Sequence, residues 1–511
     1  MKQNSTINNV VIVGGGSAGW MTAAALSKHL PKSINIKLVE SDLISTVGVG
    51  EATIPAIRIF NQGLGIDEAE FMKETNATFK LAIKFENWAR QGDSYFHAFG
   101  FYGYPVNGVP FHNYWLKQNN TIKSDSIHDY NLAHQACVAN KFAYRQFNPN
   151  DEDSRYFYAF QFDATLYAQY LRKISEGRGV ERIEGKVVDV LQNTQSGTIE
   201  SLVLESKKTV SGDLFIDCTG FRALLIDKTL KVGYKDWSHW LPVNNAWAVS
   251  TDYPKGATIP PYTRARALSA GWQWRIPQQN RTGDGNVFCD AYISKEEALD
   301  EFLSNLEGKP ISDPRLIKFR TGMREKLWSK NCVSIGLSSG FLEPLESTSI
   351  YLIQASILQL IQNFPNGEEN KSNQNEFNSL MKSRYEEARN FLILHYKATE
   401  REDTKFWKYC KNMSIPDELA YRIKLFEDRG FVAGKKLDLF SEHSWLAVYF
   451  GQRIMPKAYD PRTDNLSMEQ INNNLSKIKM GINNSLDKMP THNETLKAFC
   501  PADIATPLKN S

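Results

Sequence analysis

The sequence predicts a mixed α/β (α+β) fold followed by a mainly helical C-terminal region. Three observations support this prediction. A glycine-rich turn links a short apolar run to a helix near the N-terminus, further strand-like runs follow, and from about Glu368 to Asp428 the pattern turns helical. The Asn-, Lys- and Ser-rich tail from about Ser467 predicts loop and amphipathic surface helix. We therefore expect a core over residues 1–365 and a helical region over residues 366–511.

The first strand-like segment opens a Rossmann-type βαβ unit. Asn9–Val13 is a short β-branched run that predicts a buried parallel strand. After the glycine-rich turn, Trp20–His29 predicts a helix, and Ile34–Val39 predicts a second strand that ends at Glu40. Strand, turn, helix and strand in this order form one βαβ unit.

The glycine-rich turn predicts a dinucleotide site. In its GxGxxG motif, Gly14 permits a tight turn, Gly16 lets the backbone approach a pyrophosphate, and Gly19 lets the helix pack on the strand. The helix N-terminus adds N–H groups and a positive dipole end. Glu40, at the end of the second strand, can accept hydrogen bonds from a ribose. A glycine-rich turn without a ligand is the alternative.

Charge and cysteine usage argue against several classes of protein. The 60 basic and 57 acidic residues leave a net charge of +3 with no basic motif, so we expect no nucleic-acid partner. The six cysteines lack CxxC spacing, which predicts reduced, buried thiols rather than a disulfide framework or a zinc site. Val10–Ser27 is mostly apolar, but its three consecutive glycines make a poor membrane span, and no secretory signal precedes it. We expect a cytoplasmic protein without a membrane segment.

Segments further along the chain extend the predicted sheet. Lys186–Leu191, Ile199–Glu205 and Leu214–Asp217 predict strands of a mixed sheet. Asp213–Gly220, which reads DLFIDCTG, resembles the strand and turn of FAD proteins of the glutathione-reductase-like and hydroxylase-like classes. Ser334–Gly340, which reads SIGLSSG, resembles the segment that brings further backbone groups close to a flavin. The resemblance implies an FAD-binding fold rather than an NAD-binding one.

Three motifs narrow the class further. Gly271–Pro277 reads GWQWRIP, Gly340–Ile350 reads GFLEPLESTSI, and Thr78–Phe85 reads TFKLAIKF. With these motifs the chain resembles the flavin-dependent halogenases of the tryptophan/indole type, from Val10 to about Trp407. Taken alone, the two tryptophans of GWQWRIP fit an ordinary cross-strand aromatic pair equally well.

The resemblance implies a reaction and its catalytic residues. Reduced FAD, oxygen and chloride or bromide would give hypohalous acid, which Lys80 would hold by a hydrogen bond or convert into a haloamine. Glu346 would stabilise the cationic ring intermediate and remove its proton. Backbone N–H groups near Thr348 and Ser349 would hold the halide, and Ser349 stands where many tryptophan halogenases have glycine.

The resemblance also implies the cofactor contacts. Gly48–Pro55 is similar to the mobile strap that covers the flavin in this family, and a rigid turn is the alternative. The predicted FAD-binding residues are Gly14, Gly16, Ser17, Ala18, Gly19, Glu40, Gly50, Ala52, Val187, Leu337 and Ile350.

The predicted substrate pocket is aromatic. His97 and Phe99 are two residues apart in an extended segment, so an imidazole and a phenyl ring can clamp a flat indole. We expect Pro55 and Trp445 to add to this pocket, with a structural role for His97 and core packing of Trp445 as the alternatives. Phe440–Gln452 shows no counterpart of the tyrosine pair and carboxylate that hold the amino-acid end in enzymes acting on free tryptophan. Simple indoles, phenols and larger natural products are equally open as substrates.

Two other functions stay open on the sequence alone. A flavin-dependent aromatic hydroxylase shares the dinucleotide site but has no use for Lys80 together with GWQWRIP. A flavin-binding protein without turnover would have no reason to keep both Lys80 and Glu346. No second nicotinamide-binding βαβ unit is apparent, so we expect a separate flavin reductase as a partner. A homodimer is an expectation from the family only.

Overall fold

The chain folds into two compact units, each assembled from three stretches of sequence. The computed structural model describes residues 7–43, 50–121, 125–144, 156–365, 371–434 and 438–501. Unit 1 consists of Met1–Asn76, Phe162–Asn244 and Lys318–Ala388, and unit 2 of Ala77–Gln161, Asn245–Ile317 and Arg389–Ser511. The units do not follow the predicted boundary at residue 365, since α9 (Lys371–Lys397) begins in unit 1 and ends in unit 2. A division of function at residue 365 stays a prediction.

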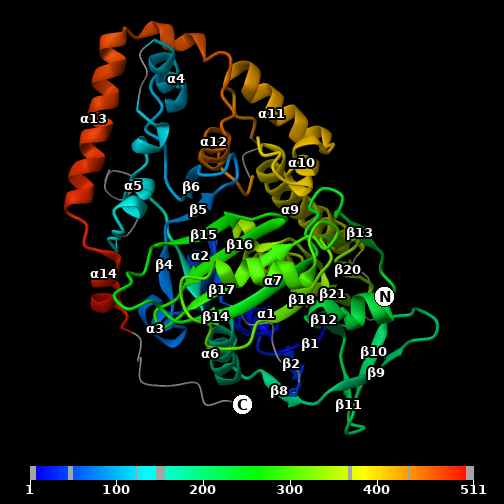
Figure 1. Ribbon diagram of the computed structural model, residues 1–511. Helices are drawn as coiled ribbons and strands as arrows, with labels where there is room; N and C mark the ends of the chain where they lie inside the picture. The colour runs from blue at the N-terminus through cyan, green and yellow to red at the C-terminus, as the bar shows by residue number, and fades with distance from the viewer. Residues whose placement is uncertain are drawn as a thin grey trace. The chain divides into compact units, whose positions relative to one another are not determined.

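Unit 1 is built on a six-stranded sheet in the order β20-β21-β12-β1-β2-β8. Its strands are β20 (Trp328–Ser329), β21 (Cys332–Ser334), β12 (Leu214–Asp217), β1 (Asn9–Val13), β2 (Asn35–Glu40) and β8 (Glu181–Glu184). β20 is antiparallel to β21, and the other neighbours are parallel. The predicted βαβ unit is present, with β1 and β2 in dark blue in Figure 1. The helix between them, α1 (Ser17–His29), begins three residues earlier than predicted.

Two small antiparallel sheets complete the strands of unit 1. One has the order β11-β10-β9, and the other has the order β13-β19-β22. Their strands are β9 (Val187–Gln192), β10 (Ile199–Leu204), β11 (Thr209–Ser211), β13 (Tyr234–Asp236), β19 (Gly322–Arg324) and β22 (Gly340–Phe341). The prediction of one mixed sheet for the runs at 186, 199 and 214 is therefore wrong. All three are strands, but only β12 joins the large sheet, because periodicity identifies a strand without identifying its partner.

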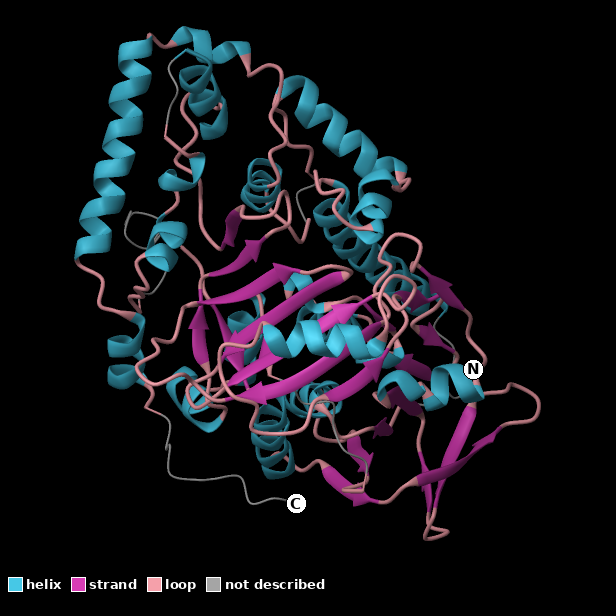
Figure 2. Cartoon of the chain, viewed as in Figure 1, coloured by secondary structure: helices cyan, strands magenta, loops and turns pink. Residues whose placement is uncertain are grey.

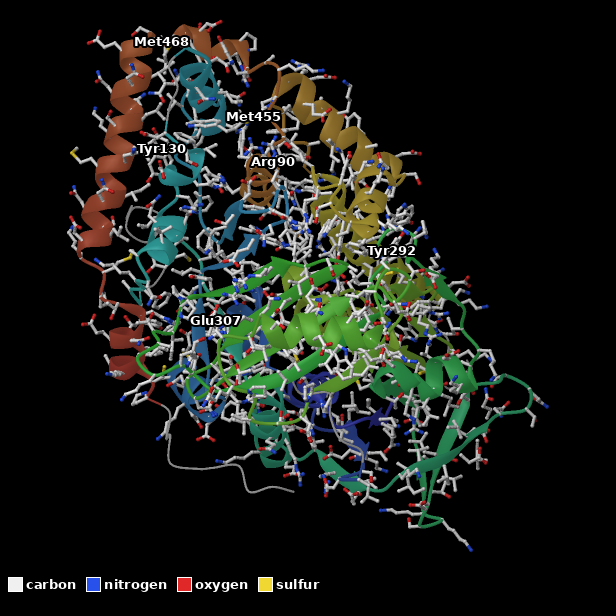
Figure 3. All side chains as sticks on the ribbon, in the orientation of Figure 1. Arg90, Tyr130, Tyr292, Glu307, Met455 and Met468 are labelled. Carbon is white, nitrogen blue, oxygen red and sulfur yellow. The ribbon has the colours of Figure 1, made fainter. Side chains whose placement is uncertain are left out.

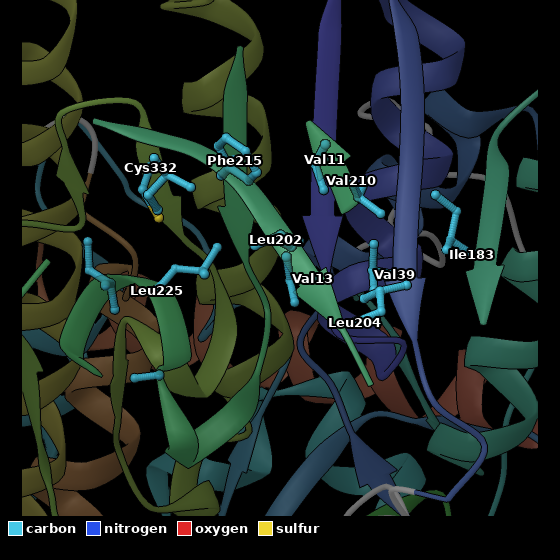
Figure 4. Packing of buried hydrophobic residues seen from close by; sticks show 13 residues of the cluster. Val11, Val13, Val39, Ile183, Leu202, Leu204, Val210, Phe215, Leu225 and Cys332 are labelled. Carbon is cyan, nitrogen blue, oxygen red and sulfur yellow. The ribbon is translucent and has the colours of Figure 1, made fainter. Parts of the chain in front are cut away.

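A hydrophobic cluster joins the six-stranded sheet to the β9–β11 sheet (Figure 4). Val11 and Phe215 come from adjacent parallel strands, and Leu202 and Val210 come from the antiparallel hairpin. All four are almost completely shielded from solvent. The side chain of Val187 packs against this cluster from the start of β9.

The helices of unit 1 cover the parallel sheet and its loops. α1 packs against α6, α8 and the two strands that it connects. The helices are α2 (Ala56–Leu64), α3 (Glu68–Glu74), α6 (Ala164–Gly177) and α8 (Ser349–Gln362), with short helical turns η3 (Gly220–Arg222), η4 (Leu224–Thr229), η5 (Gly336–Ser338) and η6 (Pro344–Glu346). A two-residue strand, β3 (Glu51–Ala52), precedes α2.

Unit 2 is built on a seven-stranded sheet in the order β18-β14-β17-β16-β15-β5-β6. Its strands are β5 (Ala82–Glu86), β6 (Ser94–Ala98), β14 (Asn245–Thr251), β15 (Tyr262–Ala267), β16 (Gly271–Pro277), β17 (Thr282–Phe288) and β18 (Arg315–Lys318). The GWQWRIP motif is the whole of β16. β4 (Thr78–Lys80) pairs antiparallel with β7 (Ala159–Phe162). Figure 2 shows the large sheet in magenta, with α7 (Lys295–Ser304) packed against β14 and β17.

The remaining helices of unit 2 lie mostly in the C-terminal part of the chain. They are α4 (Phe111–Thr121), α5 (Leu132–Val138), α10 (Lys405–Asn412), α11 (Asp417–Arg429), α12 (Glu442–Gly451), α13 (Met468–Asp487) and α14 (His492–Phe499), with short turns η1 (Ile127–Tyr130) and η7 (Pro461–Asn465). The helical pattern from about Glu368 to Asp428 and the surface helix of the tail are confirmed. The six cysteines are buried and free, as predicted. Among the described residues, no helix is both long enough and apolar enough to cross a membrane.

Candidate functional site

Three parallel strands of unit 1 end at the same level of the sheet. Val13 at the end of β1 is in register with Asp217 at the end of β12, and Asp217 is in register with Ser334 at the end of β21. Val39, the residue before Glu40, is in register with Val13 on the other side. The glycine-rich turn, the DLFIDCTG segment and the SIGLSSG segment therefore meet at one sheet edge. Ligands of open α/β sheets bind at such an edge, outside the carboxyl ends of the strands. We call this edge of the sheet the cofactor edge.

The glycine-rich turn is packed as its motif predicts. Gly14 has φ of +110°, and a Cβ there would overlap the carbonyl oxygen of Cys218. A Cβ on Gly19 would overlap the carbonyl oxygen of Gly14, so the third glycine lets α1 sit directly on the turn. Gly16 is the N-cap of α1 and offers no side-chain cap, which leaves the first N–H groups of the helix for an anion. These features fit the pyrophosphate of a dinucleotide.

Glu40 is placed for a ribose but is also held by arginine. Its Oε1 accepts a hydrogen bond of 2.7 Å from Nε of Arg182, and Nη1 of Arg172 lies 3.7 Å from the same oxygen. Its Oε2 points at the turn, because a Cβ on Gly15 would overlap it. The sequence motif leaves Gly15 unspecified, so this constraint and the two arginines were missed. Only the three-dimensional arrangement of the strands reveals these contacts.

Asp217 organises the second segment of the site. Its Oδ2 accepts hydrogen bonds from the backbone N–H groups of Leu225 (2.8 Å) and Ile226 (2.9 Å), and its Oδ1 accepts from Thr219. The carboxylate is fully buried, and these donors replace water. Its backbone carbonyl accepts a hydrogen bond from the hydroxyl of Ser338, which ties the DLFIDCTG segment to η5.

The SIGLSSG segment reaches the start of α1. Gly336 has φ of +81°, and a Cβ there would lie 2.8 Å from the Cβ of Ala18. Leu337 follows in η5 and is half-buried. The side chain of Arg324 fixes the segment, because its Nε donates to the carbonyl oxygen of Ser338 at 3.2 Å. Arg324 stands outside the sequence motifs and was not predicted as a site residue.

The described part of the predicted strap is a short strand and a helix start. Gly50 has φ of +74°, Ala52 is buried, and Pro55 is the N-cap of α2. Gly48 and Val49 lie outside the described residues. The protein surroundings raise the pKa of the Glu51 carboxyl to about 7 by desolvation, although part of the side chain surface is exposed.

A tight turn before α8 carries the predicted base and halide residues. Glu346 ends η6 and is fully buried, and Ser347 follows with a left-handed φ of +55°. Thr348 is the N-cap of α8, Ser349 is its first residue and Ile350 is buried in its first turn. Among the described residues, the buried Oγ1 of Thr348 has no hydrogen-bond partner. An unpartnered hydroxyl beside the N–H groups of a helix N-terminus fits a small anion.

Lys80 belongs to unit 2, where it is fully buried at the end of β4. Its Nζ lies 5.3 Å from the centroid of the Phe99 ring. The backbone places the two side chains, because the N–H of Phe99 donates to the carbonyl oxygen of Leu81 at 2.7 Å. At the other end of β4, the hydroxyl of Thr78 donates to the carbonyl oxygen of Pro277 at 2.7 Å. This hydrogen bond connects the predicted catalytic strand to the end of the GWQWRIP strand.

The predicted substrate residues of unit 2 form one aromatic cluster. His97 and Phe99 meet edge to face, with centroids 6.0 Å apart and planes at 79°, so the two rings do not form a parallel clamp. Phe391 from α9 contacts His97 at 5.6 Å and Trp445 at 5.1 Å. Phe440 stacks on Phe391 at 3.8 Å. Phe391 and Phe440 were not predicted, because neither stands in a motif.

The tryptophan pair of β16 is buried on one face of the large sheet. Trp272 and Trp274 have centroids 6.1 Å apart with planes at 60°. Gly285 on β17 makes room for the Trp274 ring, which a Cβ at that position would overlap. Lys80 and the tryptophan pair belong to unit 2, and Glu346 with the cofactor edge belongs to unit 1.

The comparisons with known proteins decide the class. The sequence model of the family described as tryptophan halogenase matches residues 9–468. The chain belongs to the tryptophan halogenase family. In structure the halogenase is similar to Xcc4156, a flavin-dependent halogenase from Xanthomonas campestris, with 44% identity, a TM-score of 0.94 and coverage of 98% of this chain and 100% of that chain. BrvH, a flavin-dependent halogenase from Brevundimonas sp. BAL3, has 41% identity, a TM-score of 0.93 and coverage of 97% and 99%.

A sequence relative gives the same class. Tryptophan 6-halogenase SttH from Streptomyces toxytricini is 38% identical over 440 residues, which cover 82% of this chain and 83% of SttH. The halogenase is therefore an enzyme that depends on flavin, as FAD in its reduced form, and on a halide. The predicted family, fold class, function and cofactors are confirmed, and the hydroxylase and the flavin-binding protein without turnover are set aside. The roles of individual residues stay predictions.

Proposed function

We propose that this halogenase directs hypohalous acid through Lys80 to an electron-rich, indole-like substrate, and that Glu346 removes the proton from the halogenated ring. The main support for this proposal is the position of Lys80, which is fully buried and faces an aromatic cluster. Burying an ammonium group costs free energy. A lysine at such a position therefore has a role other than that of a surface charge.

The surroundings of Lys80 support delivery of a reagent. The phenyl ring of Phe99 borders its Nζ, and the edge-to-face packing of His97 fixes that ring. An amine held against apolar rings can position an electrophilic halogen while water is excluded. The lysine then confines a reagent that would otherwise oxidise side chains at random.

The turn before α8 supports the roles of Glu346 and of the halide residues. Glu346 is fully buried, so its carboxylate can act on a ring cation without competition from water. Thr348 and the backbone N–H groups at Ser349 form the proposed halide contact, since the positive end of the α8 dipole attracts an anion.

The cofactor edge of unit 1 supports FAD binding by the predicted residues. Gly16 and the first N–H groups of α1 would hold the pyrophosphate, Glu40 the ribose, and Gly50, Ala52, Leu337 and Ile350 the remaining contacts. The contribution of Val187 is the weakest of these, because its side chain packs against the hydrophobic cluster. When bound, reduced FAD supplies the oxygen activation that converts a halide into hypohalous acid. A separate flavin reductase, a homodimer and a cytoplasmic location remain part of the proposal.

The aromatic cluster supports a flat substrate. The His97 edge and the Phe391 and Trp445 rings offer faces and edges to an indole. Pro55, in the strap of unit 1, stays a predicted substrate residue. We propose simple or substituted indoles as the substrate class, since no counterpart of an amino-acid clamp is apparent around Phe440–Gln452. SttH is named for its action on tryptophan, which makes tryptophan the first alternative.

The test of Lys80 is a mass-spectrometric assay with reduced FAD from a reductase, oxygen, bromide and indole. Lys80→Ala is expected to lower brominated indole at least 100-fold while flavin oxidation continues, because oxidant forms but is not delivered. Lys84→Ala is the matched control, since its Nζ also lies over a ring, that of Phe96 at 5.9 Å, on a partly exposed side chain. Halogenation at the wild-type rate in Lys80→Ala would refute the proposal.

A second pair of variants tests the base. Glu346→Gln is expected to slow bromination at least 10-fold with FAD affinity unchanged, because the amide cannot accept the ring proton. Glu343→Gln provides the comparison, since Glu343 is also fully buried and lies three residues earlier in the same motif. If Glu343→Gln loses bromination and Glu346→Gln keeps it, the assignment of the base is wrong.

A further inference from the structure

A continuous series of aromatic rings runs through unit 2 from the GWQWRIP strand toward the surface. Trp274 contacts Trp272 with ring centroids 6.1 Å apart, and Trp272 lies 6.4 Å from Trp88. Trp88 contacts Trp407 at 5.4 Å and Tyr396 at 5.3 Å. All five rings are buried. They provide consecutive redox-active side chains at short spacing.

The series ends at two partly exposed tyrosines. Trp407 contacts Phe406 at 5.1 Å, and Phe406 contacts Tyr292 at 5.7 Å. Tyr292 contacts Tyr409 at 6.2 Å, and each of these tyrosines exposes 36% of its surface. Figure 3 labels Tyr292, which follows β17 in sequence.

The inner end of the series shares a sheet face with a predicted substrate residue. Trp274 pairs with Ala265, Ala265 pairs with Phe85, and Ile83 on the same strand as Phe85 pairs with His97. Residues directly opposite or two apart on one strand point to the same face. The tryptophan pair and His97 therefore lie on one face of the seven-stranded sheet.

We propose that these rings form an electron-transfer path that removes oxidising equivalents from the enzyme interior and delivers them to Tyr292 and Tyr409 at the surface. The proposal rests on the halogenase reaction, because that reaction is the source of the oxidant. Idle turnover without a substrate leaves reactive halogen and oxygen species beside buried side chains. The path gives them a harmless electron donor.

The electron balance of the path is simple. Two one-electron transfers from Trp274 or Trp272, together with one proton from water, convert one molecule of hypohalous acid into halide and water. Each indole cation radical takes an electron from the next oxidisable ring, and the electron hole moves outward to Tyr292 or Tyr409. Phe406 is not oxidised itself, so the electron tunnels past its ring between Tyr292 and Trp407. The oxidised phenol releases its proton to water and becomes a neutral phenoxyl radical. A soluble thiol or ascorbate then returns one hydrogen atom to it.

Proton chemistry gives the path its direction. In the part of the chain that the structure describes, Nε1 of Trp272 and Nε1 of Trp274 have no hydrogen-bond partner. Nε1 of Trp88 and Nε1 of Trp407 donate to backbone carbonyl oxygens at 3.0 and 2.7 Å. Neither arrangement contains a base that can take the indole proton. The electron hole is therefore not trapped on these indoles as a neutral radical. The surface tyrosines are the first phenols in the series that can release a proton into water.

Arg401 places a positive charge beside the path, and Asp403 neutralises it. The guanidinium of Arg401 lies 4.6 Å from the Trp407 ring, which disfavours a positive charge on that indole. Nη2 of Arg401 is paired with Oδ2 of Asp403 at 2.8 Å, which offsets this effect. Tyr396 offers a parallel step, since it contacts Trp88 at 5.3 Å and Phe406 at 6.1 Å.

The experiment is idle turnover of the full-length enzyme with reduced FAD, oxygen and bromide, without organic substrate and without added thiol. Freeze-quenched electron paramagnetic resonance is expected to show a tyrosyl radical in the wild type. In the double variant Tyr292→Phe/Tyr409→Phe the signal should fall at least fivefold, because phenylalanine keeps the ring but cannot be oxidised. Peptide mass spectrometry should then find at least twofold more oxidised Trp88, Trp272 and Trp274.

Tyr421→Phe is the matched control, since Tyr421 is 62% exposed on α11 and takes no part in the ring series. Its radical signal and oxidation pattern should equal those of the wild type. An unchanged signal in the double variant, or no tyrosyl radical in the wild type, overturns the path. Bromination of indole, measured on the same preparations, identifies a failure of the proposed function separately.

Discussion

Glu40 and Gly15 pack so tightly that Gly15 cannot be replaced by a larger residue unless Glu40 also changes. A Cβ on Gly15 would overlap the carboxylate of Glu40 and lie 2.7 Å from its Cβ, while Arg182 prevents the carboxylate from turning away. Steric strain of this kind destabilises proteins by about 1–3 kcal/mol. The same contact brings Oε2 to the place where a ribose would bind.

We predict that Gly15→Ala lowers the melting temperature and weakens FAD binding at least tenfold. Fluorescence titration with FAD and thermal denaturation measure the two effects. Gly15→Ala/Glu40→Ala should recover much of the melting temperature, because the carboxylate is gone, but not FAD affinity, because the ribose contact is lost. Wild-type stability of Gly15→Ala would contradict the packing argument.

At the residue scale, the sequence predicted the side chains that stand in motifs. Lys80, Glu346, Thr348 and Ser349 were found because their neighbours carry a family pattern. Phe391 was not found, because its position depends on packing between α9 and β6. A sequence window cannot contain a contact between residues almost 300 positions apart.

The turn before α8 combines strain and an unsatisfied hydroxyl in consecutive residues. Ser347 adopts a left-handed φ of +55°, and among the described residues Thr348 Oγ1 is buried without a partner. Each feature costs free energy, about 1–3 kcal/mol for a buried unsatisfied polar group. Such costs collect at functional sites, where the strained element is held for its contacts.

We predict that Thr348→Val leaves stability unchanged or raises it by about 1 kcal/mol, since the unsatisfied hydroxyl is removed while the shape is kept. The same variant should raise the KM for bromide at least threefold if the hydroxyl contacts the halide. Ser349→Ala serves as the comparison, because a backbone N–H contact survives that change. Denaturant unfolding and bromide-dependent kinetics measure both effects, and an unchanged bromide KM in Thr348→Val would remove its side chain from the halide site.

At the element scale, the predictions succeeded where a strand is strongly apolar and bounded by glycine. β1 has the predicted residues, and the helix after it was found because the glycine turn marks its start. β9 and β10 were recognised as strands but assigned to the wrong sheet. Their short connection makes them an antiparallel hairpin, and that pairing depends on the turn rather than on hydrophobic pattern.

Desolvated histidines make unit 2 sensitive to acid, since His492 is buried and His128, His134 and His443 are partly buried. Desolvation lowers the pKa of His134, His443 and His492 to about 4 and that of His128 to about 3. The positive charge of His134 contributes to the shift of His128. Since each pKa lies below the ordinary value of 6.5, the unfolded chain binds more protons in the interval between them. Stability that is present above about pH 6.5 is lost as the pH falls toward 4.

We predict that the wild-type free energy of unfolding falls steeply between pH 6.5 and pH 4. His492 alone accounts for about 3 kcal/mol of this loss, because it is fully buried. His492→Asn should flatten the profile, since an amide can still donate to the carbonyl oxygen of Ile259 but does not titrate. His239→Asn, at an exposed position, should follow the wild-type profile. Equal slopes in wild type and His492→Asn would contradict the prediction.

At the scale of the whole molecule, the sequence predicted the class of fold but not how the chain is divided. Each compact unit takes three separate stretches, so the chain crosses between the units several times. Composition and periodicity describe neighbours in sequence, and nothing in them reports which stretches share a core. The predicted boundary at residue 365 marks where strands give way to helices, which is a different property from compactness.

The register of Val13, Asp217 and Ser334 also has a consequence for how the protein is made. Roughly 200 residues separate the first of these strands from the second, and at about 5–20 residues per second a ribosome needs on the order of ten seconds or more to produce them. During that interval β1 is outside the ribosome without the neighbour that covers its β12 edge, and an uncovered apolar strand is prone to aggregation. The cofactor edge is complete only after residue 334 has emerged, so FAD cannot protect shorter nascent chains by binding there.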